Sequence, residues 1–425
     1  MIVFVLASPG EILISILFEN VNVLTCTGEP AFSGEVLIED NRIVAIARHP
    51  EHISLPAAQR IDCAGATLMP GLIEPHAHLS FTNVANSVHL GEIPPEDHAL
   101  LTAQNALVML DHGFTSCVSA AAAKPRLDVV VRNFINSGAI PGPRLLAASP
   151  ELTVTGGLGD ARLAHLYREN FGLICDGPDE FRRTARWMCR EGVDTLKINI
   201  SGDDAIPGAK ARDTVMTDAE VAAVCEVARQ LNKRVAAHTR SADSVKMALR
   251  HGVDILYHAT LVDDDACAQL EAQRTRIFVA PTLGNLYSAL HEAAPWGLTR
   301  EIAEARGARI ELERGIENMQ ALKRRGVRIL PGGDYGFAWC PIGTNARDIE
   351  HFVKLLHFSP MEAIESATKL GGEIMMMGHE LGQIKIGYLA DLLLVDGDPL
   401  ADVTLLQDSD KLRAIVKDGR FHKQA

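Results

Sequence analysis

Hydrophobic and polar positions follow two different patterns along the chain, and the change of pattern divides it. Near the N-terminus, between Ile14 and Arg60, the apolar runs are short: ISILFENVNVLT, EVLIED and RIVAIA. ADLLLVDG and LRAIVKDGR repeat this pattern near the C-terminus. Short β-branched runs separated by turn residues are typical of strands joined by hairpins. We therefore expect a small β-sandwich-like domain formed by both chain ends, residues 12–68 and 385–425, with residues 1–11 as an N-terminal extension.

In the middle of the chain the pattern of hydrophobic and polar positions changes. Short apolar runs alternate there with stretches of helical periodicity, which indicates βα units and a parallel sheet. Thr217 and Ser241 precede two of the amphipathic stretches as N-caps, and the second stretch stops at Gly252. Eight such units make a closed barrel, so we expect an α/β protein with a (β/α)8 TIM barrel over residues 69–384. The candidate strands end near Pro75, Ser119, Ala148, Asn199, His238, His258, Ala280 and Gly333.

Composition and charge argue against several classes of protein. The net charge is −13 without a long Lys/Arg run, which argues against a nucleic-acid or anionic-membrane partner. The apolar start has no basic residue before Arg42 and is broken at Pro9, so we expect neither a secretory signal nor a membrane span. The eight cysteines occur singly, which fits reduced thiols. We expect a cytoplasmic protein with a small-molecule substrate, and leave open whether it forms a homo-oligomer.

The first candidate for chemistry is a pair of histidines in MPGLIEPHAHLSF. His76 and His78 lie at the end of an apolar run. Residues i and i+2 of a strand point the same way, so the two imidazoles converge. The motif alone has limited specificity, because chance pairs arise in a chain with 16 histidines.

Four further polar residues stand where later candidate strands end. Lys197 lies within GVDTLKINISGD, His238 closes RVAAH, His258 closes VDILYH, and Asp334 follows RILPGG. Enzymes with a (β/α)8 barrel place their sites at the carboxyl ends of the strands. Each residue also has an ordinary interpretation: a hydrogen-bonded core histidine, a surface lysine, or an aspartate in a turn or helix cap. Together they predict a metal site, because imidazole and carboxylate suit zinc, manganese, iron or cobalt.

The order of these residues along the chain resembles that of the amidohydrolase superfamily. PGLIEPHAH is similar to the family's first-strand motif, and LGQIKIGYLADLLLVDGDPL to its return to a small β domain. The resemblance extends from about Ile14 to Arg420. A narrower likeness, in VAAHTRSADSVKMALRHGVDILYHA and LPGGDYGFAWCPIGTNARDIEHFV, is to the prolidase-like and imidazolonepropionase-like group, in the branch with molinate and phenylurea hydrolases.

The resemblance implies two divalent metal ions, zinc by preference, with manganese, iron or cobalt as alternatives. A hydroxide bridging the ions would attack an amide, urea, carbamate or peptide-like carbonyl, and Asp334 would carry the proton to the leaving nitrogen. Lys197 would be carboxylated with CO2, its carbamate bridging the ions. The resemblance assigns His76, His78 and Asp334 to the more buried ion and His238 and His258 to the other.

One position departs from the family's pattern. A tyrosine that helps to hold the substrate tends to stand two residues beyond the strand-five histidine in prolidase-like enzymes, and Arg240 stands here instead. Its guanidinium could bind a substrate carboxylate or carbonyl, or it could be a salt-bridged rim residue. The departure makes dipeptide cleavage less expected than hydrolysis itself.

Two alternative functions remain possible, and so do two roles for a pair of tryptophans. A mononuclear deaminase or imidazolonepropionase-type enzyme would use one ion and leave Lys197 unmodified, and a non-catalytic barrel scaffold would be expected to lose ligands. The presence of every ligand type argues against the scaffold. Trp296 and Trp339 lie in loops after the last candidate strands, where they would either line an aromatic-accepting pocket or simply pack.

Overall fold

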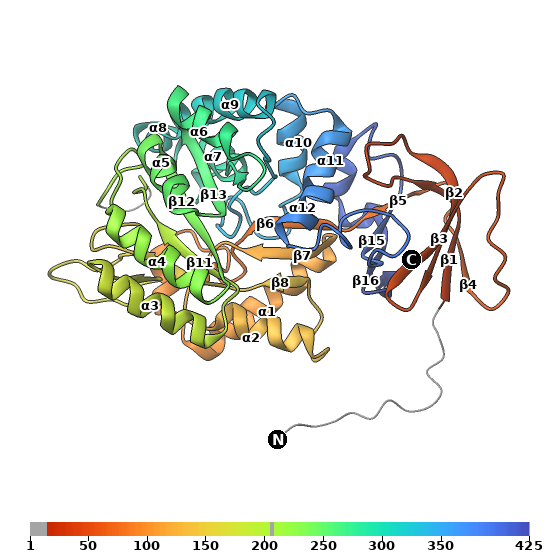
Figure 1. Cartoon of the computed structure of the whole chain (residues 1–425), viewed down its shortest axis with the longest axis horizontal. Helices are drawn as coiled ribbons and strands as arrows, with labels where there is room; N and C mark the ends of the chain where they lie inside the picture. Colours follow the sequence, from red (N-terminus) through yellow and green to blue (C-terminus); the bar gives the residue numbers. More distant parts are fainter. Residues whose placement is uncertain (1–14, 205–207, 425) are drawn as a thin grey trace, which may run out of the picture.

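The structure is a computed structural model that describes residues 15–204 and 208–424 (Figure 1). The expectation for residues 1–11, and the first residues of the 12–68 segment, lie outside the described residues. Within the described ranges the fold is mixed α/β with parallel sheets, as predicted. No helix in these ranges is long and apolar enough to cross a membrane.

An eight-stranded sheet combines the two ends of the chain, in the order β17-β16-β15-β5-β1-β2-β3 with β4 paired to β1. The ends meet where β15 runs antiparallel to β5, with Leu392 opposite Pro70. Buried Phe18, Val36 and Leu392 belong to the core of this sheet. Its strands are β1 Ser15–Val23, β2 Phe32–Glu39, β3 Arg42–Arg48, β4 Gln59–Asp62, β5 Thr67–Pro70, β15 Leu392–Val395, β16 Leu412–Lys417 and β17 Arg420–Gln424.

Parallel strands fill the middle of the chain in two sheets, β6-β7-β8 and β10-β9-β11-β12-β13-β14. Strands such as β7, β11 and β14 are buried along their whole length, as expected for strands covered on both faces. They are β6 Leu72–Ala77, β7 Phe114–Ser119, β8 Arg144–Leu146, β9 Ala148–Thr153, β10 Gly172–Ile174, β11 Thr195–Asn199, β12 Arg234–Ser241, β13 Ile255–Leu261 and β14 Phe278–Ala280.

Two predicted strand ends are wrong. The strand expected to end near Ala148 is divided at Ala147, whose N–H bonds to the Asp194 carboxylate at 2.8 Å instead of a neighbouring strand. The strand expected to end near Gly333 is reduced to an isolated bridge between Ile329 and Val279. Pro331 follows directly and has no N–H to continue a ladder.

The helices pack on the parallel strands and bury one face each (Figure 1). The helix boundaries predicted from caps are confirmed: Thr217 forms a capping box on α4, and α5 runs from its Ser241 cap to Gly252 with φ 84°. The helices are α1 Pro95–Asp111, α2 Leu127–Asn136, α3 Pro178–Glu191, α4 Asp218–Gln230, α5 Ala242–His251, α6 Asp264–Ala272, α7 Leu283–His291, α8 Arg300–Ala305, α9 Ala308–Arg324, α10 Arg347–Lys354, α11 Pro360–Ala367 and α12 Lys369–Ile374.

Candidate metal centre

A cavity of about 450 Å³ opens at the carboxyl ends of the parallel strands. It is the size of a small-molecule site. Side chains from five strands and from the segment after Ile329 converge on it, although they are far apart in the sequence. All seven residues singled out from the sequence line it: His76, His78, Lys197, His238, Arg240, His258 and Asp334.

His76 of β6 and His78, the residue after this strand, meet Asp334 on one side of the cavity. Nε2 of His78 lies 3.0 Å from Oδ1 of Asp334, and Nε2 of His76 lies 3.6 Å from the same oxygen. Burial lowers the pKa of His76, so its imidazole is neutral. Burial alone would raise the pKa of Asp334, but the two histidines lower it well below its usual range. Asp334 is therefore an anion at neutral pH.

The backbone is strained where these side chains turn into the cavity. Asp334 has φ 62°, His258 has φ 73° and Thr282 has φ 63°, all in the left-handed region that residues other than glycine rarely adopt. Such positions cost about 1–3 kcal/mol each and cluster at functional sites. All three residues line the cavity.

Lys197 stands in the middle of β11 and is 1% exposed. Its Nζ lies 4.8 Å from the centre of the Tyr257 ring. Burial lowers the pKa of Lys197, which favours the neutral amine. A neutral amine is the form that can react with CO2 to give a carbamate, so the environment fits the role that the family resemblance implies.

His238 and His258 are the other two histidines of the candidate metal site, with ring centroids 4.2 Å apart. Burial lowers the pKa of both imidazoles. Arg240 lies behind His238, with its Nε 3.3 Å from His238 Nε2. Two carboxylates hold the guanidinium: Asp203 at 2.7 Å from Nη2, and Glu311 on Nη1. Arg240 is thus an ion-paired residue that also lines the cavity.

Several cavity residues were missed by the sequence reasoning. Glu151 of β9 lines the cavity, and its buried Oε2 has no hydrogen-bond partner among the residues that the structure describes. Burial raises its pKa. An acidic residue inside the run ASPELT was the available signal. Trp296 and Trp339 both line the cavity, which favours the pocket interpretation over simple packing. Phe81 and Phe337, which were not singled out, also line the cavity.

The side chains fit divalent metal ions. His76, His78 and Asp334 each offer one ligand atom, and these atoms lie within 4.8 Å of one another. Neutral imidazoles and an ionised carboxylate are the ligands that zinc and related metals prefer. His238 and His258, with Lys197, lie across the same cavity.

Comparisons with known proteins show what the chain is similar to. The model of the amidohydrolase family matches residues 67–421. Ochratoxinase of Aspergillus niger is 24% identical, over 99% of this chain and 88% of its own length. A prolidase structure with N-methylphosphonate-L-proline bound is 26% identical over 97% of this chain and all of its own, with a TM-score of 0.86. A molinate hydrolase structure is 19% identical over 96% of this chain and 94% of its own, with a TM-score of 0.77, which shows a shared fold.

Proposed function

The chain belongs to the amidohydrolase family, which confirms the resemblance seen in the sequence, and from that premise we propose that it hydrolyses an amide-like C–N bond of a small molecule with two divalent metal ions. His76, His78 and Asp334 would hold one ion, and His238 and His258 the other. Lys197, as a carbamate, would bridge them. Zinc is the metal we expect first, with manganese, iron and cobalt as alternatives.

The observation that carries this proposal is the convergence of six buried or nearly buried side chains of the right types on one cavity. Divalent ions bound there would lower the pKa of a water molecule and polarise the substrate carbonyl. The reaction class is supported by the similar proteins, which include an ochratoxinase and a prolidase. Hydrolysis of a C–N bond follows from family membership, whereas the choice among amide, urea, carbamate and peptide-like substrates is part of the proposal.

The chain's own residues would move the proton. Asp334 is ionised at neutral pH and accepts a hydrogen bond from His78, which fixes its carboxylate over the cavity. The His78 ring is held from behind, where its Nδ1 lies 3.2 Å from the carbonyl oxygen of Ala121. In this arrangement Asp334 would take the proton of the attacking water and pass it to the departing nitrogen.

The proposal extends to the architecture and the location. The parallel strands and the segment around Ile329 would close as a (β/α)8 barrel over residues 69–384, which is supported by Gly332 lying against Pro75 and His76. Residues 12–68 and 385–425 would form the small β domain. We further infer a cytoplasmic location, because all eight cysteines are free thiols.

The test is the metal content of protein purified without chelator and supplied with bicarbonate. We expect about two ions per chain, falling to about one or fewer in a Lys197→Ala variant, because the bridge is lost. Lys354→Ala, at an exposed lysine of α10, is the matched control and should keep the wild-type content.

The alternatives predict other results. About one ion per chain, unaffected by Lys197→Ala, would contradict the two-metal centre and support a mononuclear, deaminase-type or imidazolonepropionase-type enzyme. No bound metal and no hydrolysis of any amide, urea or carbamate would leave the non-catalytic scaffold. Hydrolysis that requires two ions and is lost in Lys197→Ala is the outcome we expect.

A further inference from the structure

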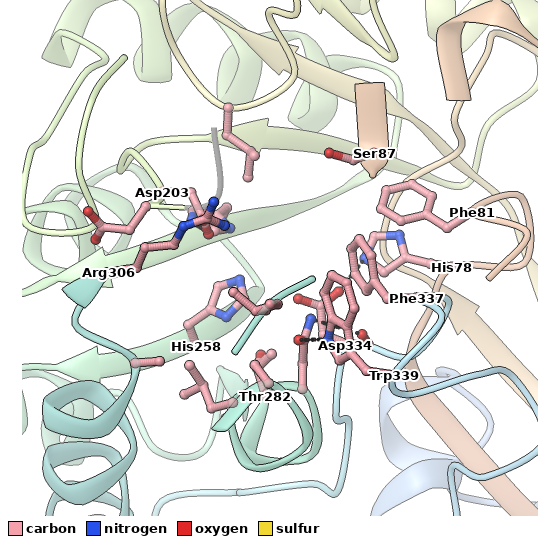
Figure 2. Close-up of a pocket in the computed structure, with 18 of the residues that line it drawn as sticks. His78, Phe81, Ser87, Asp203, His258, Thr282, Arg306, Asp334, Phe337 and Trp339 are labelled. Atoms are coloured by element: carbon pink, nitrogen blue, oxygen red, sulfur yellow. Dashed lines mark hydrogen bonds and ion pairs between the residues drawn. The ribbon is translucent and has the colours of Figure 1, made fainter. Parts of the chain in front are cut away.

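The segment that carries Asp334 has little support from neighbouring strands. The strand expected before it is reduced to the bridge between Ile329 and Val279, and Asp334 has a left-handed φ of 62°. Figure 2 shows Asp334 on the wall of the cavity beside His78. A metal site needs its ligand atoms at fixed positions, so this carboxylate depends on contacts from outside the sheet.

The start of α7 holds the main chain of this segment. The Asn285 N–H donates to the Gly333 carbonyl at 2.9 Å, and the Asn285 side-chain amide donates to the Asp334 carbonyl at 3.4 Å. The Thr282 N–H donates to the Gly332 carbonyl at 3.2 Å. These bonds support the backbone as far as Asp334 and leave the next residue to other contacts.

The first turn of α10 holds the residue that follows Asp334. Tyr335 is buried, and its hydroxyl donates to Oδ1 of Asp348 at 3.0 Å. Asp348 is buried as well, and the same oxygen lies 3.1 Å from Nδ1 of His351. The Asp348 carboxylate is therefore fixed within its own helix, and it fixes the Tyr335 ring in turn.

Two glycines make room for this contact. A Cβ on Gly284 would lie 2.6 Å from both Oδ1 of Asp348 and the Tyr335 hydroxyl oxygen, and a Cβ on Gly333 would lie 2.7 Å from Oδ2 of Asp348. No side chain larger than that of glycine fits at either position without displacing the hydrogen bond. The close approach of three segments indicates that the position of the Asp348 carboxylate is tightly specified.

The same turn of α10 also holds the strand that carries His76. Asn345 lies three residues before Asp348, and its side-chain amide donates to Oε2 of Glu74 at 2.9 Å. Oε1 of Glu74 accepts a hydrogen bond from the His76 N–H at 2.8 Å. The Asn345 side-chain oxygen accepts from the Gly343 N–H at 3.1 Å, which sets the orientation of the amide.

We propose that Asn345 and Asp348 are positioning residues for the metal site. Asp348 fixes Asp334 through the Tyr335 ring, and Asn345 fixes His76 through the intervening glutamate. Neither Asn345 nor Asp348 lines the cavity, so both act through their neighbours. The inference rests on the proposed function and deepens it, since Asp334 and His76 are the proposed ligands of one ion. Ligands that are held in advance lose little freedom when the ion binds, which raises its affinity.

Tyr335→Phe removes only one hydroxyl from this network and is the first variant to test. The metal-free protein is titrated with Co²⁺ in the presence of bicarbonate, and bound ions are counted while visible absorption is recorded. One of the two ions should bind about tenfold more weakly than in the wild type, the lower end of the usual effect of losing a group that orients a ligand. The absorption of that ion should change, because it follows the coordination geometry. The other ion should keep its affinity.

Further variants assign the effect to α10. Asp348→Ala should weaken the same ion at least as much, and Asp348→Asn should recover part of the loss, because its side-chain oxygen can still accept from Tyr335. Asn345→Ala should weaken this ion too. Tyr388→Phe, which loses a comparable hydroxyl bond to the Gly378 carbonyl at 3.1 Å, is the matched control. A merely structural network would lower resistance to urea and leave the cobalt absorption as it is.

The two proposals fail in different ways. Wild-type affinity and absorption in Tyr335→Phe, or the same change in Tyr388→Phe, overturns the inference and leaves the hydrolase standing. If Asp348→Ala does not fold, Tyr335→Phe decides alone. Absence of metal binding in the wild type counts against the proposed function, and hydrogen exchange of residues 330–340 in the metal-free protein then decides the inference. Exchange should be several-fold faster in Tyr335→Phe, and unchanged exchange overturns the inference.

Discussion

Lys197 and Glu151 are partners across the neighbouring parallel strands β11 and β9, and both side chains line the same cavity. The pairing places a carboxylate beside the nitrogen that we propose to carry a carbamate. The Glu151 carboxylate favours a positive charge on Lys197. It would equally oppose a negative charge there, since like charges repel strongly where water is excluded. Glu151 therefore opposes formation of the proposed bridge.

Glu151→Gln should make the metal site easier to assemble. The amide has nearly the same shape as the carboxylate, so the substitution removes the charge next to Lys197 with little change in packing. We expect the variant to reach full metal content at a several-fold lower bicarbonate concentration than the wild type. The measurement is the number of metal ions bound per chain as a function of bicarbonate concentration. Glu169→Gln, at an exposed glutamate that accepts a hydrogen bond from Tyr167, is the control. A higher bicarbonate requirement would mean that Glu151 supports the bridge.

Asp334→Asn should strongly lower turnover while sparing the fold. The asparagine amide cannot accept and return a proton, so kcat should fall by about 10²–10⁴-fold, the usual contribution of general acid–base catalysis. Steady-state kinetics and metal content are measured on the same preparations, because Asp334 is also a proposed ligand. Only a fall in kcat at unchanged metal content supports proton transfer. Full turnover in the variant would exclude that role.

The strand-end residues could be predicted because their signal is local. His76 and His258 lie in the buried strands β6 and β13, and His78 directly follows β6, so short stretches of sequence indicated both the strands and the positions of these side chains. Family resemblance then supplied the grouping, which no local pattern could give. The site residues lie in one cavity because the carboxyl ends of parallel strands meet on one side.

Other features depend on contacts distant in sequence. The break at Ala147 is caused by the Asp194 carboxylate, which no pattern around Ala147 reveals. Arg240 forms an ion pair with Glu311 of α9. The sequence around Arg240, VAAHTRS, gives no sign of this partner, so the ion pair could not be predicted from it. Such pairings require the three-dimensional arrangement of helices and strands.

Arg240→Met should destabilise the protein. The methionine keeps much of the side-chain volume but leaves Asp203 without the 2.7 Å ion pair and Glu311 without its guanidinium partner. Removing one partner of a buried ion pair costs about 3–5 kcal/mol of unfolding free energy. Urea unfolding measures the loss, and Arg314→Met at an exposed pair should change stability far less. Normal stability combined with a raised KM for anionic substrates would instead identify Arg240 as the substrate contact.

Asp128 should make the stability of the wild type depend on pH. Its carboxylate is buried on α2, accepts a hydrogen bond from Ser119, and has one oxygen without a partner among the described residues. Burial raises the pKa of Asp128 from 3.8 to about 6. The folded state therefore binds this proton more tightly than the unfolded state. The resulting stabilisation is fully present below about pH 4 and is lost as the pH rises through about 6.

Asp128→Asn resembles the protonated form and cannot titrate, so it isolates this effect. The unfolding free energy of the wild type minus that of the variant should fall by about 3 kcal/mol between pH 4 and pH 7, since each pKa unit is worth about 1.4 kcal/mol. Urea unfolding across this range gives the difference, in which other titrating groups cancel. Asp179→Asn, at a carboxylate that is 96% exposed, should show a nearly constant difference. A difference that rises with pH for Asp128→Asn would mean that the carboxylate is stabilised as an anion, and Arg132 of the same helix, which lowers the pKa of Asp128, would then outweigh the effect of burial.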